Sequence, residues 1–198
     1  MFARAVRLAF CPSIKVDALS ASIVSLLARF VVASVLLRFF LTSFLTKIDG
    51  FGLSVGAFVQ ILPKQMAAAG YDPSLIPWPL HLVVIAGTVA EPLLPLLVVL
   101  GLATRPAAVG MIGFLVVMSL TDIYGHGVDA ATIGRMFDSD PYGKILDQRL
   151  LWVFVLMIPA WLGGGAASLD AVAWPIVRRL TGNADVRARS EKQVGDIH

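Results

Sequence analysis

The sequence contains few charged residues and a single cysteine. Of its 198 residues, 15% are charged and 58% are hydrophobic, whereas soluble domains have about 25% charged and roughly 45 to 50% apolar residues. The mean hydropathy of +0.82 exceeds what one soluble core of this size can bury, so lipid must supply a second apolar environment. The single cysteine, Cys11, excludes an intramolecular disulfide and any mechanism that needs a cysteine pair within the chain.

The sequence also lacks the short motifs of several enzyme classes. It has no Walker loop for phosphates, no GxSxG nucleophile elbow, no HExxH zinc motif and no CxxC pair for thiol exchange or haem attachment. His81, Asp122 and His126 do not have the spacing of metal ligands, so we expect no metal site. No catalytic residue can be assigned, and whether the chain is an enzyme stays open.

Long apolar runs are present instead. A membrane-spanning helix needs about 20 apolar residues, and four segments fit that requirement: about 22–46, 79–102, 106–124 and 148–166. We therefore predict an all-α membrane protein with a four-transmembrane-helix bundle inside residues 19–180. The short apolar stretch before the first run is broken at Pro12 and does not resemble a cleavable signal, so we expect the first span to remain in the mature chain.

The basic residues suggest an orientation in the membrane. Positively charged residues are enriched in cytoplasmic segments. The side that holds both termini has nine: Arg4, Arg7, Lys15, Arg105, Arg178, Arg179, Arg187, Arg189 and Lys192. The two long loops have five: Lys47, Lys64, Arg135, Lys144 and Arg149. We expect segment 1–18 and a disordered tail, 181–198, to be cytoplasmic. Because these charges flank apolar runs, we expect contact with a lipid bilayer and not with nucleic acid.

Two shorter helices are expected outside the spans. Val55, Phe58, Leu62 and Met66 recur at nearly helical spacing within residues 54–69 and predict a short extracytoplasmic surface helix, on the outer surface or packed over the bundle mouth. Ser168 is a suitable N-cap for an interfacial C-terminal helix over residues 168–180.

Two charged residues, Arg38 and Glu91, lie far from the ends of the predicted spans and are the most informative. A charge at the centre of a spanning helix costs roughly 2.5 to 3.5 kcal/mol. Arg38 lies 12 residues after Leu26 and Glu91 lies 10 residues before Gly101, which are depths of about 18 and about 15 Å. We therefore predict an Arg38–Glu91 intramembrane pair. It is either a structural salt bridge, or Glu91 accepts protons or contacts a ligand in a polar cavity. Arg29 is expected to snorkel to lipid phosphates.

A second polar group is expected at the outer mouth of the bundle, where the spans end. It comprises Lys47, His81, Asp122, His126, Asp147 and Arg149. These residues form either a solvated rim or a site for a quinone head group or a small anion. Pro92 and Pro95 remove backbone donors just after Glu91 and are expected to kink the second span.

Several of these motifs together resemble the DoxX family. The first motif is Leu36-Leu37-Arg38, which is followed by Lys47. The second is Glu91 with the apolar run after it, which is closed by Leu100-Gly101-Leu102-Ala103-Thr104-Arg105. The third is Asp147-Gln148-Arg149-Leu150-Leu151-Trp152, which precedes the last span. The resemblance covers about residues 26–175. It implies a small four-helix protein of the bacterial inner membrane, in which Arg38, Lys47, Glu91 and residues 147–149 occupy the polar positions of the family. Many members have a His-Gly pair where this chain has Thr42-Ser43-Phe44.

The resemblance also suggests a function. Some relatives are similar to the small subunit of a thiosulfate:quinone oxidoreductase, others associate with thiol and oxidative-stress proteins, and others accompany metal-binding-peptide systems. We expect an accessory subunit of a quinone- or thiol-linked membrane redox system, with a soluble or membrane redox partner and a quinone as the candidate substrate. The alternatives are a small-solute or metal-related transporter and a structural membrane partner for a soluble protein.

Overall fold

The computed structural model describes residues 17–173 and 175. Within this part of the chain, four helices are long and apolar enough to cross a membrane. They are, in chain order, α2 (Ala18–Val31) continued by the π-helical η1 (Val32–Leu37) and by α3 (Arg38–Leu45); α6 (Trp78–Leu100); α7 (Thr104–Leu120) continued by the π-helical η3 (Thr121–His126); and the π-helical η4 (Lys144–Arg149) continued by α9 (Leu150–Leu162). The predicted all-α, four-helix membrane bundle is confirmed.

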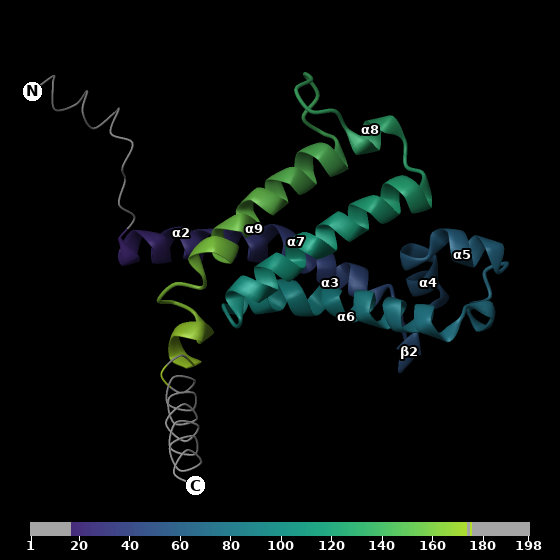
Figure 1. Cartoon of the computed structure of the whole chain (residues 1–198), viewed down its shortest axis with the longest axis horizontal. Coiled ribbons are helices and arrows are strands. Elements are labelled where there is room, and N and C mark those ends of the chain that lie inside the picture. The colour runs from purple at the N-terminus through teal and green to yellow at the C-terminus, as the bar shows by residue number, and fades with distance from the viewer. Residues whose placement is uncertain (1–16, 174, 176–198) are drawn as a thin grey trace, which may run out of the picture.

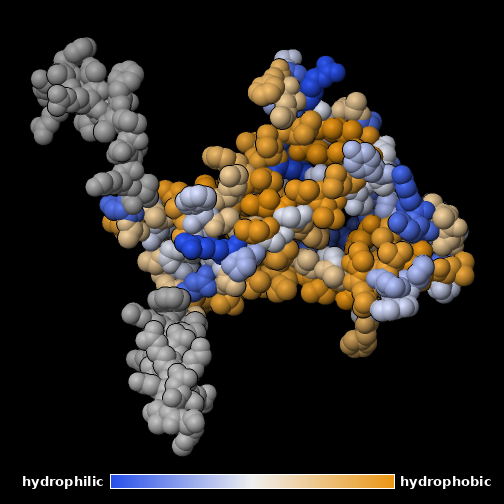
Figure 2. All heavy atoms as spheres, in the orientation of Figure 1, coloured by the Kyte–Doolittle hydropathy of each residue, from blue (hydrophilic) through white to orange (hydrophobic). Residues whose placement is uncertain are grey.

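The outer surface of these helices is apolar. Large hydrophobic side chains such as Phe30, Val116 and Phe154 are at least half exposed, and hydrophobic residues cover the middle of the visible face in Figure 2, between more hydrophilic ends. Helix α6 alone is about 34 Å long at 1.5 Å per residue, against about 30 Å for the hydrocarbon core of a bilayer. Lipid is the environment that covers such a surface.

The four helices do not stay together over their whole length. Helix α7 packs against both α6 and α9, while α9 packs on α2 and α6 packs on η1 and α3. The first helix therefore has α9 beside its first half and α6 beside its second half, and α9 diverges from it (Figure 1). This divergence opens the bundle at one end.

That open end, here called the loop end, has its own small elements. They are the hairpin strands β1 (Ile48–Asp49) and β2 (Gly52–Leu53), helices α4 (Val55–Ile61) and α5 (Pro63–Ala68), the 3-10 turn η2 (Pro73–Leu75) and helix α8 (Ala130–Ile133). The predicted surface helix over residues 54–69 is thus two helices, divided where Pro63 starts the second one. Ser54 caps α4 through its side chain, which accepts a hydrogen bond from the Ala57 amide.

Two separate apolar cores hold these elements. The larger one lies between the spans and contains Val32, Leu36, Phe40, Val98, Ala107, Ala108, Met111, Leu115 and Leu156. The smaller one lies under α4 and α5 and contains Ala57, Phe58, Leu62, Met66, Ile76 and Val84. Because Val84 belongs to α6, the second core fastens the first loop onto the bundle.

The opposite end, here called the terminal end, is closed around Arg29. The expectation that Arg29 snorkels to lipid is wrong, since this side chain is only 5% exposed. Its guanidinium donates to the carbonyls of Val98 and Val99 in the last turn of α6 and to those of Gly164 and Ala167 after α9, at 2.7 to 3.1 Å. The last carbonyls of a helix have no partner within the helix. Arg29 supplies a hydrogen bond to the Val99 carbonyl and adds a second one to the Val98 carbonyl, which also accepts from the Gly101 amide.

Gly101 makes this arrangement possible. Its φ of +68° lies in the left-handed region, which lets the Gly101 and Leu102 amides turn back onto the end of α6. A Cβ at this position would lie 2.5 Å from the Ser168 Cβ and 2.8 Å from the Arg29 Cζ. Both the backbone conformation and the space therefore require glycine.

Asp170 completes the terminal end. Its carboxylate accepts hydrogen bonds from the Ala103 and Thr104 amides and from the Thr104 hydroxyl, at 2.6 to 2.9 Å. Burial acts to raise the pKa of this carboxyl, but these hydrogen bonds and nearby Arg29 act against it, and the pKa lies below its ordinary value. The first turn of α7 is thereby tied to the segment that follows α9.

The predicted C-terminal helix is described only in its first part. Ser168 accepts a hydrogen bond from the Ala171 amide through its side chain, as an N-cap does, and residues 169–173 and 175 are helical. The rest of the predicted helix, the tail 181–198 and residues 1–16 lie outside the described part of the chain. The described start and end of the chain lie at the same end of the bundle (Figure 1).

Candidate functional site

A cavity occupies the space where the helices diverge at the loop end. Its volume is about 600 Å³, within the roughly 300 to 1,000 Å³ of typical ligand pockets. The polar lining residues are Ser43, Lys47, Gln60, Glu91, Thr121, Asp122, His126 and Arg149, and the apolar ones are Phe39, Ile61, Val83, Ala86, Gly87, Ala90, Phe114, Val117 and Met118. The cavity thus combines apolar walls with a few concentrated polar groups.

The deepest polar feature of the cavity wall is an ion pair between Lys47 and Glu91. The Lys47 Nζ lies 2.9 and 3.0 Å from the two carboxylate oxygens of Glu91, and the two side chains are only 2% and 7% exposed. Helix α3 ends just before Lys47, whose side chain runs back along the helix and donates to the Ser43 Oγ at 2.8 Å. A buried charge is tolerated when it is paired and hydrogen-bonded in this way.

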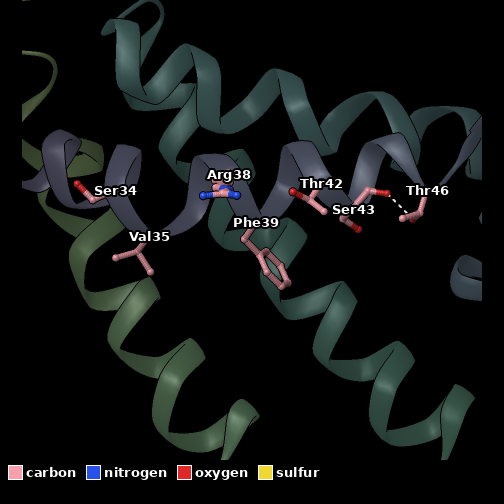
Figure 3. A pocket seen from close by; sticks show the side chains of 7 residues that line it. All are labelled: Ser34, Val35, Arg38, Phe39, Thr42, Ser43 and Thr46. Atoms are coloured by element: carbon pink, nitrogen blue, oxygen red, sulfur yellow. Dashed lines mark hydrogen bonds between the residues drawn. The ribbon is translucent and has the colours of Figure 1, made fainter.

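The predicted pairing of Glu91 with Arg38 is wrong. Arg38 is exposed on the outward face of α3, and it lines a separate shallow groove on that helix (Figure 3). Equal depth in two spans places two residues at one level, but their orientation around the helix axes decides whether they meet. Lys47, which we had expected at the outer mouth, takes the carboxylate instead.

A second ion pair of the cavity lining joins Asp122 in η3 to Arg149 in η4, so this wall comes from different helices than the wall with Lys47 and Glu91. The Arg149 guanidinium donates to the Asp122 carboxylate and, at 3.0 Å, to the Ser119 Oγ. The two side chains are 26% and 13% exposed. The sequence prediction named both residues, and the structure brings them together with Lys47 around one cavity.

The histidines divide between two places. His126 lines the cavity, and its Nε2 lies 3.1 Å from the Gln60 carbonyl oxygen. His81 packs its ring on Phe58 with centroids 4.8 Å apart and lies outside the cavity wall, as part of the packing under α4. Asp147 also lies outside the cavity lining. Its carboxylate accepts a hydrogen bond from the Gly143 amide at 2.7 Å.

Irregular helix turns position the polar residues of the second wall. Thr121, Asp122 and His126 lie in η3, and Arg149 ends η4. A π-turn widens the helix and changes which way the following side chains face, and such turns are frequent at functional sites. Sequence patterns based on the regular 3.6-residue period do not predict this change of direction.

Sequence reasoning missed several polar groups of the wall. The Ser43 and Ser119 hydroxyls accept hydrogen bonds from Lys47 and Arg149, and Gln60 lines the cavity. Their only signal in the sequence is a polar residue close to a span end. Thr88, one turn before Glu91 on α6, has a buried hydroxyl without a hydrogen-bond partner in the described residues. Within the same residues, no group of three or more His, Cys, Asp or Glu could hold a metal ion.

A known protein family matches the part of the chain that contains the Lys47–Glu91 pair. The model of the DoxX family matches residues 24–121. The chain belongs to the DoxX family. The DoxX match includes Arg38, Lys47 and Glu91 and ends one residue before Asp122, so it covers the first wall of the cavity and not the ion pair of the second. No curated protein and no solved structure matches the chain.

The chemistry that this DoxX cavity can perform follows from its groups. Two of the five N–H donors of Arg149 are engaged by Ser119 and Asp122, and the Ser43 hydroxyl accepts from Lys47 while its own proton can be donated. Donors therefore face the cavity from both walls, and carboxylates stand behind them as proton acceptors. The apolar residues between these walls suit a flat or hydrocarbon-bearing molecule.

Proposed function

We propose that this DoxX protein is an accessory subunit of a quinone-linked redox system and that the loop-end cavity binds the quinone head group. The observation that carries the proposal is the presence of two ion pairs in the lining of one mostly apolar cavity of about 600 Å³. A quinone has two carbonyl oxygens that need donors on opposite sides of an apolar ring. Ser43 on one wall and Arg149 on the other are suitable donors.

The proton chemistry of a quinone also fits these residues. Reduction of a quinone to a hydroquinone consumes two electrons and two protons. The described residues contain no cysteine, and the electrons would come from the redox partner, which is why we propose an accessory role. Glu91 and Asp122, each held beside a cation, would hold or pass the protons between the ring oxygens and the open end of the cavity.

We also infer the membrane from the DoxX family match and the orientation of the chain from its charge distribution. We propose the bacterial cytoplasmic membrane as the location, with both termini in the cytoplasm and the loop end outside. The excess of basic residues on the side of the termini supports this orientation, as does the position of both described chain ends at the terminal end. A reporter fused after His198 should be cytoplasmic, and a periplasmic reporter would contradict the orientation.

A cavity-filling substitution tests the binding site. Ala86 lines the cavity, whereas Val89 on the same helix is 49% exposed and does not line it. Ala86→Phe should therefore weaken binding of decylubiquinone to the purified protein in mild detergent at least tenfold, as measured by calorimetric titration. Val89→Phe is the matched control and should leave the affinity within about twofold of that of the wild type.

The accessory role needs a second measurement. Quinone reduction by native membranes should fall when the wild-type chain is replaced by Ala86→Phe, at equal protein abundance, and should not fall with Val89→Phe. Wild-type protein that fails to bind decylubiquinone, or two variants that behave alike, would refute the quinone site. Normal binding without any change in membrane quinone reduction would refute the redox role alone.

A further inference from the structure

Arg38 lies on the outward face of the first helix and has no ion-pair or hydrogen-bond partner among the described residues. The ion pairs of the described residues are those of Lys47 with Glu91 and of Asp122 with Arg149, and no described residue forms a hydrogen bond with the Arg38 side chain. Arg38 lies nine residues, or about 13 Å, beyond Arg29, whose side chain marks the terminal end of the bundle. Since α6 is about 34 Å long, Arg38 is near mid-depth.

The side chain cannot easily escape from this depth. Helical side chains lean toward the N-terminus of their helix, and for Arg38 this direction leads away from the nearer end of the helix, at Leu45. An arginine that faces hydrocarbon at mid-depth is costly, and such residues normally face a protein partner or a water-filled space.

Arg38 belongs to a polar stripe. Ser34, Arg38, Thr42 and Thr46 follow one another at intervals of four residues, on one side of the first helix (Figure 3). Together with Val35, Phe39 and Ser43 they line a shallow groove. We call this surface the Arg38 face. Hydroxyl-bearing and other small residues are typical of surfaces on which membrane helices pack closely.

We propose that the Arg38 face is the docking surface for a transmembrane helix of a different protein, which places an Asp or Glu carboxylate against Arg38. A helix is the element expected at this depth, because unpaired backbone groups are not tolerated in lipid. A carboxylate is the matching group, because the planar guanidinium can bind both of its oxygens. This inference does not depend on the quinone site.

A second copy of the chain does not fit this requirement. Within the four candidate spans the acidic residues are Glu91, Asp122 and Asp147. Glu91 is paired with Lys47 and Asp122 with Arg149. The Asp147 carboxylate accepts a hydrogen bond from the Gly143 amide. A symmetric dimer through this face would also bring two Arg38 side chains together, so the carboxylate has to come from another protein.

The test uses a photo-crosslinking amino acid at Thr42, in the full chain and in native membranes. The matched control places the same group at Val116 on α7, which is 50% exposed and lines none of the cavities described above. Thr42 should yield an adduct with a membrane protein whose crosslinked helix carries an Asp or Glu, and Val116 should not yield that adduct.

The charge dependence decides the outcome. Arg38→Leu should reduce the Thr42 adduct at least tenfold without lowering the abundance of the protein, because Arg38 makes no contact that its own fold needs. Arg38→Glu should abolish the adduct, and replacement of the partner carboxylate by Arg should restore it. An adduct with a second copy of the chain, adducts with lipid only, or an adduct that persists unchanged in Arg38→Leu would each overturn the proposal.

Discussion

The Lys47–Glu91 pair gives the sharpest test of how the bundle is held together. Both side chains are almost fully buried, and Lys47 contacts both carboxylate oxygens of Glu91. We consider Lys47→Met and Glu91→Met, each of which replaces one charged group by an apolar side chain of similar length. Either substitution alone leaves the opposite charge buried without its partner.

The magnitude follows from that isolation. Removal of one partner of a buried ion pair costs about 3 to 5 kcal/mol, whereas replacement of both by apolar residues is often neutral or stabilising. Each single variant should therefore lose about 3 to 5 kcal/mol of unfolding free energy, and the double variant should lose less than either. At roughly 2 to 4 °C per kcal/mol for a chain of this size, the single variants should melt about 6 to 20 °C lower.

The assay is a double-mutant cycle on the purified protein in mild detergent. Unfolding is followed by circular dichroism against temperature and against denaturing detergent for the wild type, the two single variants and the double variant. Arg38→Met serves as the matched control, since it removes a cation from the same helix but from an exposed position. It should change the unfolding free energy by less than about 0.5 kcal/mol.

The result can contradict the structure in two ways. Lys47→Met and Glu91→Met that act additively, within about 0.5 kcal/mol, would refute a direct interaction between the two side chains. An added Arg38→Met/Glu91→Met double variant measures the coupling of Glu91 with Arg38, and a larger coupling there than with Lys47 would restore the pairing that depth alone suggested.

Three further substitutions test other parts of the fold, each followed by the same unfolding measurement. Arg29→Met removes four hydrogen bonds to carbonyls at the terminal end and should cost at least about 3 kcal/mol; a loss below about 1 kcal/mol would contradict its bracing role. Thr88→Val removes a buried hydroxyl without a partner among the described residues and should leave stability unchanged or raise it by about 1 kcal/mol, so a clear loss would show that the hydroxyl is bonded. Asp170→Asn should destabilise the protein at neutral pH, because the folded-state pKa of Asp170 lies below its ordinary value. The ionised carboxylate stabilises the fold above that ordinary value, near 4, and this stabilisation disappears as the pH falls through the folded-state pKa. The difference in stability between wild type and variant should therefore shrink in acid. A difference that is constant with pH would contradict the ionised form as its source.

Much of the fold follows from local features of the sequence. The four spans are set by the length and apolarity of continuous runs, which a bilayer requires irrespective of how the helices pack. The surface helix predicted over residues 54–69 and the cap at Ser168 depend on spacing and on a single polar side chain. The structure has the cap and has helix in that segment, but divides the segment into α4 and α5 at Pro63. Lys47, Asp122, His126 and Arg149 were expected together because all of them lie at span ends on one side of the bundle.

The pairing of charges depends on information that no local pattern contains. Lys47 follows the end of α3, so helical periodicity does not predict its direction, and the π-turns η1, η3 and η4 change the faces on which neighbouring residues lie. Arg29 shows the same limitation, because the carbonyls that it binds become neighbours only when α6 and the segment after α9 end at the same place.

The sequence by itself determined that this protein has too few charges and too many apolar residues for water, that it crosses a membrane with four helices, and which charges lie within those helices. The tertiary structure decided which of these charges are satisfied inside the bundle. Lys47 and Glu91 meet, Asp122 and Arg149 meet, and Arg38 faces outward. Composition and depth are properties of single helices, whereas a contact requires two helices to be rotated toward each other, and only their packing sets that rotation.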